Sequence, residues 1–109
     1  MNETMSQEQL EAVMGLIINA GSAKSDAMEA IQAAKAGDFT LAKEKLEAAD
    51  KSLVEAHHSQ TGLLSQEAGG NPMTVTLLAV HSQDHLMTSI TFNDMAKEVV
   101  ELYQRLEKE

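Results

Sequence analysis

Apolar side chains recur at steps of three and four residues along most of the chain, which is the period of an α-helix and not of a β-strand. In the first third the recurring positions are Leu10, Val13, Met14, Ile17, Ala20, Met28 and Ile31. In the second third one face is formed by Ala42, Leu46, Ala49, Leu53, Ala56, Gln60 and Leu63 or Leu64. Charged residues occupy the other positions there, so the pattern predicts packed amphipathic helices and an all-α fold.

Capping and turn signals divide this pattern into three segments. Residues 6–9 read Ser-Gln-Glu-Gln, a capping box in which Ser6 begins a helix. Gly37 suits the position after a helix, and Asp38 can cap the next one. The only proline, Pro72, follows a double glycine and marks the clearest loop. We therefore predict one domain over residues 1–109, with three long antiparallel helices over about 6–36, 38–68 and 73–108.

The third segment carries two apolar stripes on roughly opposite sides. The first contains Leu77, Val80, Asp84, Met87, Thr91, Met95, Val99, Leu102 and Leu106, and the second contains Val75, Ala79, Leu86, Ile90 and Val100. A helix that is apolar on two sides is buried on two sides. This predicts an oligomer in which one stripe meets a second subunit, unless the helix is instead the deeply buried centre of its own bundle. In a symmetric oligomer Asp84 would approach its own copies, and such carboxylates need protons or a shared cation.

Composition narrows the possible partners. The 109 residues include 17 acidic and 8 basic residues, which gives a formal charge of -9. No basic run could follow a phosphate backbone, so nucleic acid and anionic membrane surfaces are not expected partners. The absence of cysteine excludes disulfides, thiolate metal sites and a nucleophilic thiol. The acidic N-terminus does not resemble a signal peptide, and no apolar run approaches the roughly 20 residues that span a bilayer. We expect a cytoplasmic protein without membrane insertion.

The candidate chemistry lies in residues 80–88, where His81, Asp84 and His85 fall within about one helical turn. A neutral imidazole is a good nucleophile near pH 7 and suits a phosphoryl relay. The same three residues could form a mononuclear zinc or iron site in a helical metal-binding protein. The histidines also suit the surface of an interaction module or a two-component histidine phosphotransfer domain. No glycine-rich nucleotide loop is present, so direct use of ATP is not expected.

Four separated blocks of the chain resemble one family. They are Met14 to Gly21, Ala36 to Phe39, Glu55 to His57 with Gln60 and Thr61, and Val80 to Thr88. In this order they are similar to the lactose/cellobiose-type IIA components of the phosphoenolpyruvate-dependent sugar phosphotransferase system. That family includes the lactose and N,N′-diacetylchitobiose IIA proteins. Ser82 stands where the family usually has alanine.

The resemblance implies a homotrimer of three-helix bundles that works as a phosphocarrier. The family carries its phosphoryl group on the histidine that aligns with His81, receives it from HPr and passes it to a cysteine of the cognate IIB protein. This relay serves the uptake and phosphorylation of a disaccharide of the cellobiose, chitobiose and lactose class. The link to the membrane permease IIC is therefore indirect, and the IIA residues carry little record of the sugar.

The resemblance also implies roles for neighbouring residues. Asp84 aligns with the family's metal-binding aspartate, which three subunits share near their axis, and structural Mg²⁺ is the ion expected for oxygen ligands. Alternatively, Asp84 hydrogen-bonds an imidazole and sets its tautomer. From their spacing and the family segment, His85 and Gln83 are expected to support the phosphoryl oxygens.

Overall fold

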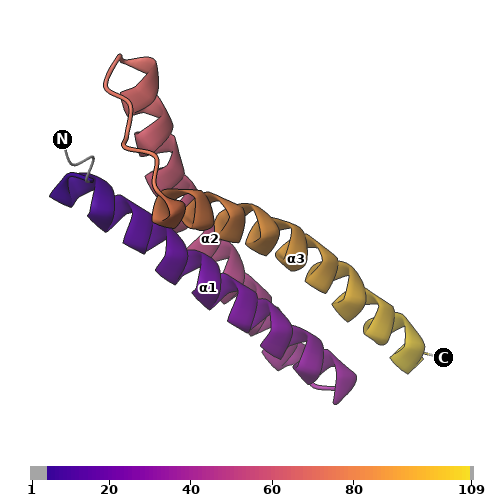
Figure 1. Cartoon of the computed structure of the whole chain (residues 1–109). Helices are drawn as coiled ribbons and strands as arrows, with labels where there is room; N and C mark the ends of the chain where they lie inside the picture. Colours follow the sequence, from indigo (N-terminus) through magenta and orange to yellow (C-terminus); the bar gives the residue numbers. More distant parts are fainter. Residues whose placement is uncertain (1–4, 109) are drawn as a thin grey trace.

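Three long helices make up the chain in the order α1 (Gln7–Lys35), α2 (Phe39–Ala68) and α3 (Leu77–Lys108). A computed structural model describes residues 5–108 and contains no strand in that range. In Figure 1, α1 and α3 run in the same direction, and α2, which lies between them in the sequence, runs in the opposite direction. The molecule is elongated, with extents of 64 × 22 × 16 Å. The predicted all-α fold with antiparallel successive helices is confirmed.

The first two helices begin and end where their capping signals predict. The Ser6 hydroxyl accepts a bond of 3.1 Å from the Gln9 backbone N–H, and the Gln9 side chain accepts one of 3.4 Å from the Ser6 N–H. Gly37 has φ of 85°, which a glycine adopts without strain in the turn after α1. The Asp38 carboxylate then accepts a bond of 3.1 Å from the Leu41 N–H and begins α2.

The third helix begins at Leu77, so the predicted start at residue 73 is wrong. The Thr76 hydroxyl accepts a bond of 3.1 Å from the Ala79 N–H, and the Thr76 carbonyl accepts one of 3.0 Å from the Val80 N–H. Thr76 therefore caps α3, while residues 71–76 are not helical. The sequence interpretation placed the start directly after Pro72, but the hydroxyl that satisfies the first free N–H groups lies four residues later.

Apart from Ala33, the buried positions of α1 and α3 alternate between steps of three and four, and those of α2 are seven apart, which is a heptad repeat. They are Val13, Leu16, Ala20, Ala23, Ala27, Ala30, Ala33 and Ala34 in α1, Ala42, Ala49, Ala56 and Leu63 in α2, and Ala79, Ser82, Leu86, Ser89, Asn93, Ala96 and Val100 in α3. In α2 the intervening half-buried positions complete the repeat. A sustained 3.5-residue repeat is typical of helices that wind around one another.

Alanines form most of this core, and they define what we call the alanine seam, the contact of α1 residues 20–34 with α2 residues 42–56. Small side chains let two helix backbones approach closely but bury little apolar area. The large apolar side chains with no exposed surface are Val13, Leu16 and Leu86. The predicted apolar face of α1 is partly wrong, because Met14 and Met28 are 39% and 44% exposed while alanines face the core.

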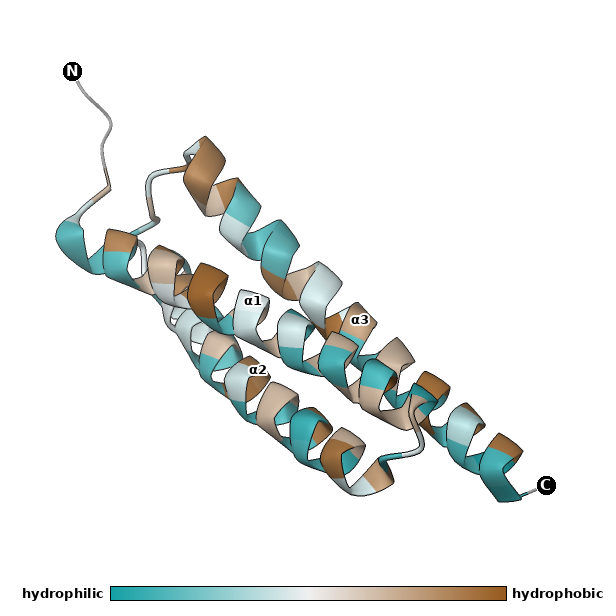
Figure 2. Cartoon of the chain, turned by 90° about the horizontal axis from the view of Figure 1, so that it is seen from below, coloured by the Kyte–Doolittle hydropathy of each residue, from teal (hydrophilic) through white to brown (hydrophobic). Residues whose placement is uncertain are grey.

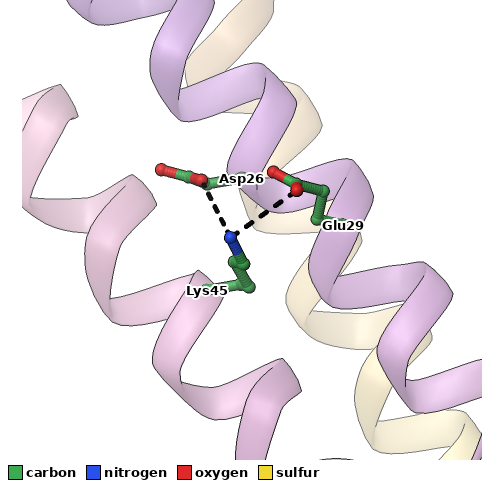
Figure 3. A network of polar contacts seen from close by, with 3 residues as sticks. All are labelled: Asp26, Glu29 and Lys45. Carbon is green, nitrogen blue, oxygen red and sulfur yellow. Dashed lines mark ion pairs between the residues drawn. The ribbon is translucent and has the colours of Figure 1, made fainter.

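An ion-pair network crosses the alanine seam at its surface. Figure 3 shows Lys45 of α2 pointing between Asp26 and Glu29 of α1, with N–O distances of 3.9 and 3.6 Å. All three side chains retain solvent exposure. Because exposed ion pairs contribute about 0–1 kcal/mol, the packing of the alanines, and not this network, holds α1 against α2.

A polar contact ties the core face of α3 to α2. Asn93 is almost fully buried, and its Nδ2 donates a bond of 2.8 Å to Oδ1 of Asp50. Lys97 lies 2.9 Å from the same carboxylate oxygen. Together with buried Ser82 and Ser89, Asn93 makes the core face of α3 unusually polar.

The opposite face of α3 forms an outer stripe, which we define as residues 77, 80, 84, 87, 91, 95, 99, 102 and 106. Its residues Leu77, Val80, Met87, Met95, Leu102 and Leu106 are between 46% and 86% exposed. In Figure 2, hydrophobic brown marks the beginning of α3 and recurs along it. The chain itself does not cover this stripe, so the alternative of a deeply buried central helix is wrong. None of the helices in residues 5–108 is long and apolar enough to cross a bilayer.

The alanine seam can be tested by enlarging one of its residues. Ala49 is fully buried, whereas the adjacent Ala48 is exposed. We expect Ala49→Leu to lower the free energy of unfolding by about 1–3 kcal/mol, because extra methyl groups force the close helices apart. Ala48→Leu is the control and should change it by less than about 0.5 kcal/mol. Urea unfolding followed by circular dichroism measures both, and equal effects would contradict a close seam.

Candidate functional site

His81 and His85 form a stacked pair on α3. Their ring centroids lie 5.6 Å apart and their planes differ by 11°. The pair lies between the core face and the outer stripe, on the side of α3 that faces α1. His81 is exposed, whereas His85 is half-buried. The structure therefore brings together two of the predicted site residues and leaves the predicted nucleophile accessible.

Gly21 of α1 provides the space in which His85 lies. A methyl group added at Gly21 would stand 3.3 Å from Nε2 of His85, which is tighter than most contacts of real side chains. In the sequence, Gly21 stands out only as the last residue of a block that resembles the family. The structure shows that the atom closest to this bare stretch of the α1 backbone is a ring nitrogen of the candidate site.

Lys24 lies one turn after Gly21 on α1, and its side chain reaches Thr88, which lies one turn after His85 on α3. Its Nζ donates a bond of 3.4 Å to the Thr88 hydroxyl, which in turn donates one of 3.2 Å to the His85 carbonyl. The pKa of His85 is lowered from its ordinary value of 6.5, first by burial and then by the positive charges of Lys24 and of protonated His81. His85 is consequently a neutral imidazole near pH 7.

Gln83 is not brought to the histidines. Two residues after His81, it lies about 200° further around the helix and faces α2. Its Oε1 accepts a bond of 2.8 Å from Nε2 of Gln60, whose nitrogen also lies 3.9 Å from Sδ of Met87. Within one chain, Gln83 is a contact between α2 and α3, and its support of a phosphoryl group on His81 stays a prediction.

The predicted metal-binding character is wrong for this chain. In the described range, no group of three or more histidine, aspartate or glutamate side chains could hold a metal ion. Asp84 lies on the outer stripe and is exposed, whereas the stacked rings of His81 and His85 face α1. We therefore assign neither magnesium nor a zinc or iron site to the chain. Sharing of Asp84 by three subunits involves further copies of the chain and stays a prediction.

Comparison with known proteins decides the family. The family model for the "PTS system, Lactose/Cellobiose specific IIA subunit" matches residues 11–104, which include every residue of the site. The chain belongs to this family. A lichenan-specific phosphotransferase enzyme IIA component of Bacillus subtilis is 47% identical over 102 residues, which are 94% of this chain and 93% of that protein.

Solved structures of the IIA family share the fold. The cellobiose-specific enzyme IIA from Bacillus anthracis has a TM-score of 0.93 at 40% identity, over 100% of this chain and 99% of that one. The chitobiose IIA of Escherichia coli, solved in complex with HPr, has a TM-score of 0.80 at 44% identity, over 94% and 99%. The chain is thus a IIA component of the cellobiose, chitobiose and lactose class. Its relatives serve different sugars at similar identity, so similarity does not select one.

Two residues of α1 were missed by reasoning from sequence. Gly21 and Lys24 are three residues apart and lie on one helix face. They contact His85 and Thr88, which are also three residues apart. Matching spacings on two parallel helices are a usable signal only after the helices are known to be neighbours.

The lowered pKa of His85 makes stability depend on pH. Between the pKa in the folded chain and 6.5, the unfolded chain binds more protons at this residue, so stability rises with pH. The contribution is complete above about pH 6.5 and is lost as the pH falls through the folded pKa. We expect wild type to lose more stability than His85→Gln between about pH 7.5 and about pH 5.5. Urea unfolding at both pH values measures this, and parallel losses would contradict the lowered pKa.

Proposed function

We propose that this chain carries a phosphoryl group on His81, receives it from phospho-HPr and delivers it to a cysteine of the cognate IIB protein. The exposed ring of His81 is the observation that carries the proposal, since a partner protein can reach it without any movement of the bundle. The complex of a related chitobiose IIA with HPr supports HPr as the donor. The chain has no cysteine, so the thiol belongs to the acceptor.

The proposed transfer exchanges one nitrogen–phosphorus bond for another. A lone pair of the neutral His81 imidazole attacks the phosphorus of phospho-HPr, the bond from phosphorus to the HPr histidine breaks, and its electron pair returns to that ring, which gains a proton as His81 loses one. In the next step a IIB thiolate attacks phosphorus, the bond from phosphorus to His81 breaks, and the His81 ring regains its electron pair and a proton. No nucleotide or oxidant takes part. The chain therefore contributes to the transfer by positioning the reacting groups and by stabilising their charge.

His85 supports this transfer in two ways. Its ring stacks on His81 and limits the rotation of the nucleophile. Because His85 is neutral, it also places no imidazolium charge beside the His81 ring before transfer. A ring N–H of His85 can then donate to a phosphoryl oxygen, which is the role predicted for it.

The relay serves uptake of a disaccharide of the cellobiose, chitobiose and lactose class, in the cytoplasm and linked to the IIC permease only through IIB. Cellobiose, chitobiose and lactose, which are named for related IIA proteins, support this class. The phosphoryl group passes through IIA without contact between IIA and sugar. Selection of the sugar therefore lies elsewhere in the system.

Phosphorylation in a reconstituted relay tests the function. The protein is incubated with phosphoenolpyruvate, enzyme I and HPr, and its intact mass is measured. We expect one phosphoryl group on wild type and on His85→Ala, and none on His81→Ala. His57→Ala, which removes another exposed histidine, is the control and should behave as wild type. Failure of wild type to gain phosphate while HPr does would exclude the relay.

We also propose that three copies assemble through the outer stripe. The stripe joins exposed Leu, Met and Val side chains along the length of α3, and the sparse core of the single chain leaves much of its apolar surface uncovered. The resemblance to the IIA family supplies the number three. Asp84 and Thr91 are the polar interruptions in this otherwise apolar surface.

One substitution distinguishes the assembly from a monomer. Met95→Glu would place like charges together in the assembly, so we expect a mass near 11.8 kDa by sedimentation, whereas wild type sediments at three times that mass. Met28→Glu, on the exposed side of α1, is the matched control and should remain assembled. A wild type that sediments as a monomer at micromolar concentration would contradict the proposal.

A further inference from the structure

Lys24 is a half-buried cation that lacks an acidic partner. Lys45 and Lys97 each pair with carboxylates, but among the described residues no carboxylate lies within ion-pair distance of Lys24. Its one hydrogen bond, to the Thr88 hydroxyl, is 3.4 Å long. Good N–H···O bonds are about 2.9–3.0 Å, so this contact is weak and easily exchanged. In a chain with a formal charge of -9, such a cation is available for an anion.

The direction of the helices aims Lys24 at the histidine pair. Because α1 and α3 run parallel, Gly21 stands beside His85 and Lys24 stands beside Thr88, one turn further on. Helical side chains lean toward the N-terminus of their helix. From Lys24 that direction leads past His85 toward His81. A flexible four-carbon stem lets the ammonium move this way when it leaves the Thr88 hydroxyl.

We infer that Lys24 binds the phosphoryl group carried by His81. The inference rests on the proposed function, because it concerns the phosphorylated state of the same site. A phosphoryl group brings nearly two negative charges and three acceptor oxygens to a surface where Asp84 is already negative. Lysine is a common phosphate ligand that acts as a point charge. Lys24 supplies the permanent positive charge that neutral His85 does not.

The equilibrium of phosphoryl transfer with HPr tests this assignment. Full-length protein is mixed with phospho-HPr, and the phosphorylated fraction is measured by intact mass. We expect Lys24→Met and Lys24→Gln to lower the equilibrium constant about tenfold, and Lys24→Arg to retain most of it, because a charge-assisted hydrogen bond is lost only in the first two. Lys35→Met removes an exposed cation from the last turn of α1 and should match wild type.

Thr88→Val separates binding of phosphate from a purely structural role. It removes the hydroxyl that accepts the hydrogen bond of Lys24 but keeps the ammonium itself. We therefore expect the equilibrium constant of transfer from phospho-HPr to stay within about twofold of wild type. The ³¹P resonance of phospho-His81 gives a second readout. A nearby cation favours the dianion, so the phosphoryl pKa should be lower in wild type and Lys24→Arg than in Lys24→Met.

Three results would overturn the inference. If Lys24→Met has the same equilibrium constant of transfer as Lys35→Met, the charge of Lys24 is not used. If Lys24→Met and Thr88→Val lower this constant equally, Lys24 acts only by holding Thr88. An unchanged ³¹P titration in Lys24→Met excludes contact with the phosphoryl group. If wild type gains no phosphate from phospho-HPr, the proposed function fails as well, which is a different result from a phosphorylated but Lys24-independent protein.

Discussion

The close approach of α1 to both of its neighbours is the constraint on which the structure depends. Alanine seam side chains allow α1 and α2 to pack with little between their backbones, and Gly21 allows the same on the side of α3. Close packing stabilises through many small contacts and not through large buried side chains. A single bundle of this kind has few fully buried large residues, so the proposed assembly through the outer stripe would add apolar burial that the single chain lacks.

The site follows from the same constraint. A larger residue in place of Gly21 would push the His85 ring outward, and the stacked geometry with His81 would change with it. The ring lies against α1 because the helix backbone there is bare. Burial at this point lowers the pKa of His85 and keeps it neutral, while His81 remains exposed one turn away. The two rings thus differ in burial because only the His85 ring lies against the bare backbone of α1 at Gly21.

Features that depend on local chemistry were predictable from the sequence. Ser6 and Asp38 cap their helices as expected, and the amphipathic face of α2 lies where the periodicity places it. The two faces of α3 also lie as predicted except at Val75, which precedes the helix and is exposed. The face of α1 was misread because alanine carries a weak hydrophobic signal beside methionine. The start of α3 was misread because Pro72 is a more obvious signal than Thr76.

Features that depend on neighbouring helices were not predictable in the same way. Gln83 was placed with the histidines by sequence proximity, but two residues along a helix lead to the opposite side, where Gln60 is its partner. Lys24 stands 57 positions before His81 in the chain, and nothing in its local sequence indicates that its ammonium reaches Thr88.

The buried amide of Asn93 has a consequence for how the helices align. A heptad core repeats every seven residues, so α3 could in principle slide by one repeat and present similar side chains to α1 and α2. The observed alignment gives the buried Nδ2 of Asn93 the carboxylate of Asp50, and a shift by one repeat removes this acceptor, which costs about 1–3 kcal/mol if the N–H group stays buried without a partner. The contact between Asn93 and Asp50 therefore fixes the position of α3 along its axis. It thereby determines that His85, about two turns before Asn93, stands opposite Gly21.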